Sequence, residues 1–139
     1  MTTSRLIARA RLVVAAAVLA LPAAAAGTLE VHNQGAVAFV SGGVGDEEQQ
    51  ALKAMIGRFN LKLTMALTNG EFVSDATVRI RDAQGQVVLD TIADGPLLFA
   101  QLKPGTYTVS CSLDGKDIQK TAHLTNGKRQ QLVFTWPSE

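Results

Sequence analysis

The chain has 139 residues, a formal net charge of +1 and a single cysteine. This length suits one modest domain. A near-neutral charge without a basic stripe argues against nucleic acid or anionic lipid as a partner, and one cysteine excludes an internal disulfide.

The first 26 residues have the layout of a secretory signal peptide. An apolar run from Leu12 to Leu21 follows three arginines, Arg5, Arg9 and Arg11, and Ala24 to Ala26 offers a cleavage site. The run is shorter than the roughly 20 residues of a spanning helix. We therefore expect cleavage, a mature chain without a membrane span, and a periplasmic or secreted location. Loss of the three arginines lowers the net charge from +1 to −2.

Residues 27–45 form an N-terminal segment with a glycine-rich loop. Thr28 to His32 alternates as a short strand does, and Ala36 to Val40 is a short apolar run. The loop then gives four candidate contact residues for a ligand or partner, Ser41, Gly42, Gly43 and Gly45. It lacks the lysine of a phosphate-binding loop, and acidic residues follow it, so we favour a helix-capping loop.

One helix is predicted, from Asp46 to Phe59. Asp46 followed by Gln49 fits an N-cap with its capping-box partner, and Glu47 and Glu48 add negative charge in the first turn. One apolar stripe follows at helical spacing, and its members are Leu52, Met55, Ile56 and Phe59. A helix this short must pack on a face or an open end of a sheet structure.

From Asn60 onward the apolar period changes to two, which is typical of strands. Turn signals such as Asn69-Gly70, Asp114-Gly115 and Asn126-Gly127 separate the runs. Seven strands are predicted, at 61–67, 76–81, 86–91, 97–102, 106–113, 116–124 and 128–136. Together they predict a mainly β fold, a seven-stranded antiparallel β-sandwich with one short N-terminal α-helix, over residues 46–139.

The hairpin from Leu97 to Leu113 is the clearest fold signal. Pro104-Gly105 predicts a type II turn, in which glycine accepts the positive φ. Tyr107 follows with its ring inward and its hydroxyl in reach of a backbone group, which would lock the corner. Alternation places Cys111 on the apolar face, where a thiol is inert.

Two arginines and two histidines are the other candidates for chemistry. Arg79 and Arg81 share the outward face of one strand and form either a basic patch for an acidic ligand or charges that protect an edge strand. His123 is interpreted as a solvated strand residue, and His32 lies in the N-terminal segment. No zinc-binding spacing is present in the sequence, and we expect neither a metal nor a cofactor.

The segment Gly95 to Val109, G-P-L-L-F-A-Q-L-K-P-G-T-Y-T-V, resembles a motif of the carboxypeptidase regulatory-like superfamily. The positions that carry the likeness are Leu97, Phe99, Leu102, Pro104, Gly105, Tyr107 and Val109. Leu97 stands where the family often has an aromatic residue. The resemblance implies a prealbumin-like (transthyretin-like), Ig-like sandwich that serves as a structural or binding accessory.

The sequence thus predicts an exported, non-enzymatic module with a structural or protein-binding role in the bacterial periplasm. Its partner is an unspecified protein or small ligand, and its oligomeric state is left open. The first alternative is small-ligand binding, with the helix as a lid over an open end of the sandwich. A transthyretin-like hydrolase is a weaker alternative, because the chain has too few histidines and ends in Trp136-Pro137-Ser138-Glu139.

Overall fold

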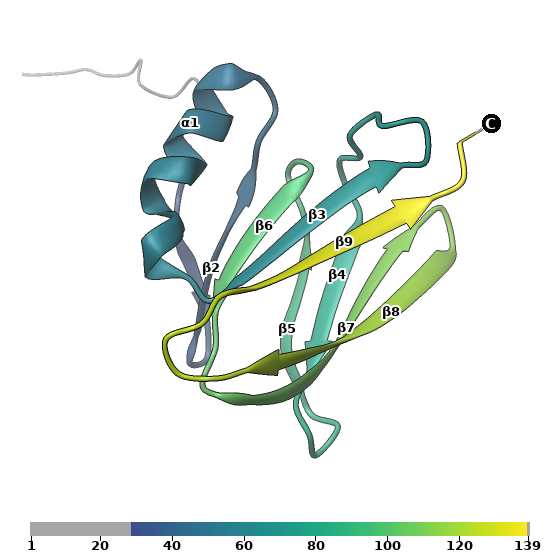
Figure 1. Cartoon of the computed structure of the whole chain (residues 1–139). Coiled ribbons are helices and arrows are strands. Elements are labelled where there is room, and N and C mark those ends of the chain that lie inside the picture. Colours follow the sequence, from purple (N-terminus) through teal and green to yellow (C-terminus); the bar gives the residue numbers. More distant parts are fainter. Residues whose placement is uncertain (1–28, 139) are drawn as a thin grey trace, which may run out of the picture.

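The computed structural model describes residues 29–138, which form two β-sheets in a sandwich-like arrangement and one α-helix (Figure 1). The predicted signal peptide lies outside the described residues. The five-stranded sheet has the order β1-β2-β6-β3-β9 and the four-stranded sheet the order β5-β4-β7-β8. The strands are β1 (His32–Gln34), β2 (Val37–Gly42), β3 (Leu61–Leu67), β4 (Thr77–Arg81), β5 (Val87–Ile92), β6 (Leu97–Gln101), β7 (Gly105–Leu113), β8 (Lys116–Leu124) and β9 (Gln130–Trp136).

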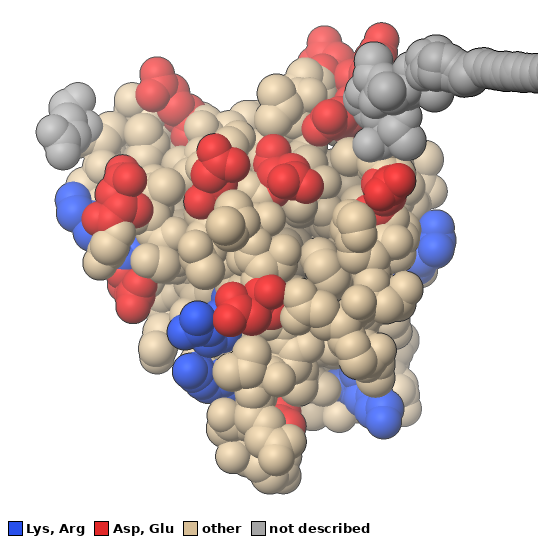
Figure 2. All heavy atoms as spheres, turned by 180° about the vertical axis from the view of Figure 1, so that it is seen from behind, with Lys and Arg blue, Asp and Glu red and all other residues tan. Residues whose placement is uncertain are grey.

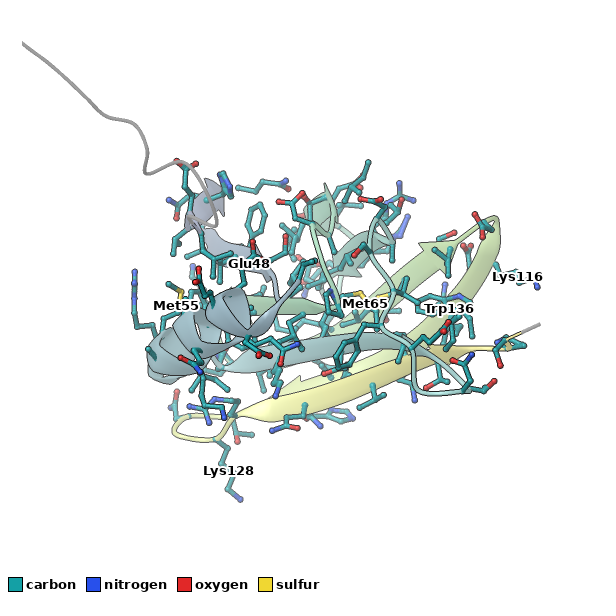
Figure 3. All side chains as sticks on the ribbon, turned by 90° about the horizontal axis from the view of Figure 1, so that it is seen from above. Glu48, Met55, Met65, Lys116, Lys128 and Trp136 are labelled. Carbon is teal, nitrogen blue, oxygen red and sulfur yellow. The ribbon has the colours of Figure 1, made fainter. Side chains whose placement is uncertain are left out.

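Alternation along the strands builds the main core between the two sheets. In β7 the side chains of Tyr107, Val109 and Cys111 are buried, while the residues between them face outward. Met65 of β3 comes from the opposite sheet and is fully buried in the same core (Figure 3). Each of the seven predicted strands is present, as β3 to β9. Most of them have one buried and one more exposed face, whereas Leu98, Phe99 and Ala100 of β6 are all buried.

The predicted count of seven strands is wrong, because β1 and β2 bring the count in residues 29–138 to nine. In β2, Phe39 faces the main core, whereas Val40 lies on the other face of the sheet and pairs with Phe99 of β6. A strand buried on both faces gives a continuous apolar run instead of alternation. This is why the run from Ala36 to Val40 was not predicted as a strand.

The prediction of a wholly antiparallel sandwich is also wrong, because β3 and β9 pair in parallel from Leu61↔Gln130 to Leu67↔Trp136. Parallel neighbours need a crossover connection. Here the chain leaves the five-stranded sheet after β6, forms β7 and β8 in the other sheet, and returns as β9. Alternation defines which face of a strand is buried, but it does not define the neighbouring strand.

The helix α1 (Asp46–Met55) continues as a 3-10 turn, η2 (Ile56–Arg58), and follows two strands rather than standing at the N-terminus as predicted. It lies on the outer face of the five-stranded sheet (Figure 1). Leu52 is fully buried there in a second cluster, with Val40, Phe59 and Phe99. No helix within residues 29–138 is long and apolar enough to cross a membrane.

The predicted corner is confirmed at Tyr107, whose hydroxyl donates a hydrogen bond to the Lys103 carbonyl over 2.8 Å. The predicted type II turn is wrong. Gly105 has a φ of 158°, which is close to extended, because this residue begins β7 and pairs with Leu124. A type II turn would need a φ near +80° at this position.

We expect Tyr107→Phe to lower the free energy of unfolding by about 1 kcal/mol, the usual net value of one hydrogen bond. The ring stays packed in the core, so only the bond to Lys103 is lost. Urea unfolding measures the change. Ser110→Ala, on the outward face of the same strand, is the control and is expected to leave stability within about 0.5 kcal/mol. Equal effects of the two variants would contradict a locking role for the hydroxyl.

Side chains also join the two sheets at both pairs of edges. The indole of Trp136 on β9 donates to the Lys116 carbonyl of β8 over 2.9 Å, and Figure 3 shows the two residues close together. At the other side, the amide of Gln34 on β1 donates to the Asp90 carbonyl of β5 and accepts from the Asp90 N–H. Each bond satisfies backbone groups that an edge strand leaves unpaired.

Candidate functional site

A groove runs between the edge strands β1 and β5. It encloses about 640 Å³ and is lined on one side by His32, Asn33 and Ser41 and on the other by Asp90, Ile92 and Asp94. A second hollow of about 210 Å³ shares some of its lining, namely His32, Ser41 and Asp94, and adds Leu29, Glu30, Val44 and Glu48. The two hollows therefore adjoin at these three shared residues, and the second one reaches the start of α1.

The two strand edges bring apolar and polar groups together in this groove. The His32 ring packs against the ring of Phe39, with centroids 5.6 Å apart, and Phe39 is buried. Ile92, at the end of β5, is 59% exposed. The groove therefore presents one exposed apolar side chain next to hydrogen-bonding groups.

Ser41 connects the groove to the predicted glycine loop. The residue is only 9% exposed, and its hydroxyl accepts a hydrogen bond from the Asp94 N–H over 3.0 Å. A hydroxyl can accept and donate at the same time. Ser41 thus holds the β5–β6 connection against β2 and still has a proton to donate at the groove.

The amides of the glycine loop are already bonded within the chain. The carboxylate of Glu48 accepts hydrogen bonds from the Gly43 N–H over 3.0 Å and from the Val44 N–H over 3.1 Å, and the Gln49 amide donates to the Gly43 carbonyl. This carboxylate occupies the position that a phosphate would take in an anion-binding loop. The capping-loop interpretation therefore fits the geometry.

The predicted capping box is wrong in its details. The N-cap residue of α1 is Gly45, with a φ of 86° and no side-chain cap, and Asp46 already lies in the first turn. Gly45 can adopt this backbone conformation because it has no Cβ. Glu48 caps the loop in place of Asp46 because its longer side chain reaches back four and five residues.

Close packing explains why a second position of the loop, Gly42, is a glycine. A Cβ on Gly42 would lie 2.7 Å from the Leu29 side chain and 3.0 Å from the Glu48 carboxylate. A Cβ on Gly95, in the β5–β6 connection, would overlap the carbonyl group of Gly42. Gly42 and Gly95 therefore bring two backbone segments together directly behind Ser41.

The structure separates the predicted arginines from the glycine loop. Arg79 forms an ion pair with Asp90 over 3.2 Å, and both side chains are close to half-exposed. Arg81 lies one outward position further along β4 and pairs with Val87 and Thr108. Because β4 lies between β5 and β7, the interpretation as edge-strand protection is wrong. Arg79 is connected to the groove through Asp90, and neither arginine lines it.

His123 and Cys111 are the remaining candidates for chemistry, and they lie on neighbouring strands. His123 is exposed on β8, as predicted, with its Nδ1 3.3 Å from the Thr106 hydroxyl. Cys111 is fully buried, and desolvation raises the pKa of its thiol to about 12. Within residues 29–138, no group of three or more His, Cys, Asp and Glu side chains is arranged to hold a metal ion.

Sequence reasoning missed most of the groove. Of its lining, only Ser41 was a predicted contact residue, whereas His32, Asn33, Asp90, Ile92 and Asp94 were not. The two walls come from segments 56 residues apart, as the Gln34–Asp90 bonds show. The break at Ala93 to Pro96 predicted a loop, but only the structure shows that this loop lies against Gly42.

The chain matches no known protein-family model and no curated protein.

Proposed function

We propose that this chain is an exported, non-enzymatic β-sandwich module of the prealbumin-like (or Ig-like), carboxypeptidase regulatory-like kind, which binds a protein partner in the periplasm. The signal-peptide pattern of the sequence supports export. The Pro-Gly-x-Tyr corner and the two-sheet arrangement support the fold assignment. The observation that carries the binding role is the groove between β1 and β5, with exposed Ile92 among hydrogen-bonding groups.

The charges around the groove indicate the kind of partner. Glu30 and Asp94 are exposed, and neither forms an ion pair with another residue in the range 29–138. Figure 2 shows acidic side chains spread over the upper half of the rear face, whereas Lys and Arg lie lower and at the sides. Complementary charge favours partner recognition and fast association. We infer a partner segment that places a lysine or arginine beside an apolar side chain.

Small-ligand binding in the same groove is the second candidate. The nearly buried Ser41 hydroxyl, which lines both hollows, favours it. Specific ligand sites combine an enclosed surface with a few placed polar groups of this kind. The helix, which was expected to act as a lid over an open end, instead covers a sheet face, so a lid movement is not part of this proposal.

Site-specific photo-crosslinking in exporting cells tests the proposal. A photoreactive phenylalanine analogue replaces Ile92, which is 59% exposed, in one protein and Val133, which is 50% exposed on the outer face of β9, in the other. We expect a covalent adduct with a polypeptide in the periplasmic fraction for position 92 and none for position 133. Asp94→Lys in the position-92 protein is expected to reduce the adduct about tenfold, because it places like charges together.

Adducts of equal yield at both positions, or an adduct unaffected by Asp94→Lys, would contradict a partner site at the groove. If no polypeptide adduct forms at position 92, the protein-binding role fails and the small-ligand candidate replaces it. Thermal melting with pooled periplasmic metabolites then tests the small-ligand candidate. A ligand at about 100 times its Kd adds roughly 2.7 kcal/mol of stability and therefore raises the melting temperature.

A further inference from the structure

A second cavity lies on the outer face of the five-stranded sheet, between α1 and strands β6 and β3. It encloses about 310 Å³. Its floor is apolar and is formed by Leu52 of the helix and by Leu97 and Phe99 of β6, and Ile56 closes it at the helix end. The main core and the β1–β5 groove lie elsewhere, so this site is independent of the proposed partner site.

The cavity exists because α1 contacts the sheet along only one narrow stripe. Leu52 is its one fully buried side chain, whereas Met55 and Ile56 remain half-buried. On the sheet side, Phe99 is 1% exposed but the neighbouring outward residue, Leu97, is half-buried. The helix therefore covers Phe99 and leaves an open flank beside Leu97, where apolar surface still meets water.

Two lysines stand at one end of this apolar floor. Lys62 of β3 pairs with Phe99 in the sheet and is half-buried, and Lys53 lies in the last turn of α1. The helix ends only a few residues before β3 begins, so both residues belong to the same end of the cavity. Neither lysine forms an ion pair within the described part of the chain.

The single carboxylate that lines the cavity, Asp46, lies in the first turn of α1, at the other end of the helix. Lys53 lies seven positions further along the chain, which corresponds to a rise of roughly 10 Å along the helix axis. The cavity thus has a cationic end, an apolar floor and a polar far rim. Two unpaired ammonium groups next to apolar surface are complementary to a ligand that carries an anionic group next to an apolar part.

We propose that this cavity binds an anionic amphiphile, a molecule with one alkyl chain and a carboxylate or phosphate head. The alkyl chain lies on Leu52, Leu97 and Phe99, and the head group accepts charge-assisted hydrogen bonds from Lys53 and Lys62. The same chemistry occurs in free alkyl carboxylates and in single-chain phospholipids. Dodecanoate and dodecyl phosphate are therefore used as separate probes for the two sources.

Calorimetric titration of the mature chain with each probe, below its micelle concentration, tests the proposal. We expect saturable binding of at least one probe and, in ¹⁵N NMR spectra, shifts confined to α1, β6 and the start of β3, where Lys62 lies. Dodecyltrimethylammonium, with the same chain and the opposite charge, is expected not to bind, and butyrate, with the head but little chain, is expected to bind far more weakly. Tighter binding of one anionic probe identifies the preferred head group.

Lys62→Gln is expected to weaken binding of the preferred probe about tenfold, because a charge-assisted hydrogen bond is lost. Lys53→Gln, at an exposed helix position, gives a second test if the first variant does not fold. Lys116→Gln, at the β7–β8 turn, is the matched control and is expected to bind as the unchanged protein does. Absence of binding by both anionic probes, equal binding of the cationic analogue, or full affinity in both Lys62→Gln and Lys53→Gln would overturn the proposal.

Discussion

Gly95→Ala is expected to lower the free energy of unfolding by about 3 kcal/mol, a large effect for the addition of one methyl group. The new Cβ would overlap the carbonyl group of Gly42, which is backbone and has no rotamer through which to move away. Relief would require the β5–β6 connection to shift away from β2. That shift would also break the bond between the Asp94 N–H and the Ser41 hydroxyl. Urea unfolding followed by circular dichroism measures the loss.

Gly57→Ala is the matched control for this prediction. A Cβ at Gly57 would have no neighbour within 4 Å, and the residue lies in the 3-10 turn after α1 with an ordinary negative φ. We expect this variant to be stabilised by about 0.5 kcal/mol, since alanine reduces the freedom of the unfolded chain. If Gly95→Ala unfolds at the same urea concentration as the unchanged protein, the direct backbone contact between Gly42 and Gly95 is contradicted.

The parts of the fold that were predictable are strands in which buried residues alternate with outward-facing ones, so that the sequence itself shows which face is buried. Tyr107, Val109 and Cys111 alternate with outward residues, and the sequence therefore locates β7 and its inward side. The bond of the Tyr107 hydroxyl was predictable for the same reason, because a buried phenol next to a turn needs a local partner. Both inferences use neighbours within a few residues.

The parts that were not predictable depend on which distant segments meet. Val40 and Phe99 face the helix while Phe39 faces the main core, so β2 has no alternation to detect. The parallel pairing of β3 with β9 joins residues that lie about half the length of the chain apart, such as Leu61 and Gln130. The alternation of buried and exposed residues has a period of two whichever strand is the neighbour and whether the two strands are parallel or antiparallel. It therefore cannot specify the neighbouring strand or the direction of pairing.

The candidate sites follow the same division. The glycine loop was predictable as a loop, but Ser41 acquires its groove only because β5 lies next to β1. The pairing of Arg79 with Asp90 was within reach, since the two residues flank one hairpin and face the same side. The cavity beside Lys62 and Leu97 was not, because it depends on where α1 crosses the sheet.

The buried thiol of Cys111 is expected to make the protein sensitive to alkali. Burial raises its pKa from 9.0 to about 12, so the native state keeps a proton that the unfolded state loses between these two values. The stabilisation is complete below pH 9 and is lost as the pH rises toward 12, because the folded pKa lies above the unfolded one. At about pH 10.5 we expect the free energy of unfolding to be roughly 2 kcal/mol lower than at neutral pH because of Cys111. This value follows from a loss of about 1.4 kcal/mol for each pH unit above 9.

Comparison with Cys111→Ala isolates this contribution. The variant leaves a small cavity and is expected to be about 1 kcal/mol less stable than the unchanged protein near pH 8. Near pH 10.5 we expect the variant to be the more stable of the two proteins, because only the unchanged protein loses the contribution of the protonated thiol. Tyr107, whose pKa is also raised by burial and by the nearby Asp82 carboxylate, is present in both proteins and cancels. Urea unfolding at the two pH values shows whether the stability curves cross. Parallel curves would mean that the thiol ionises as easily in the folded protein as in the unfolded chain, which a buried position on β7 does not permit.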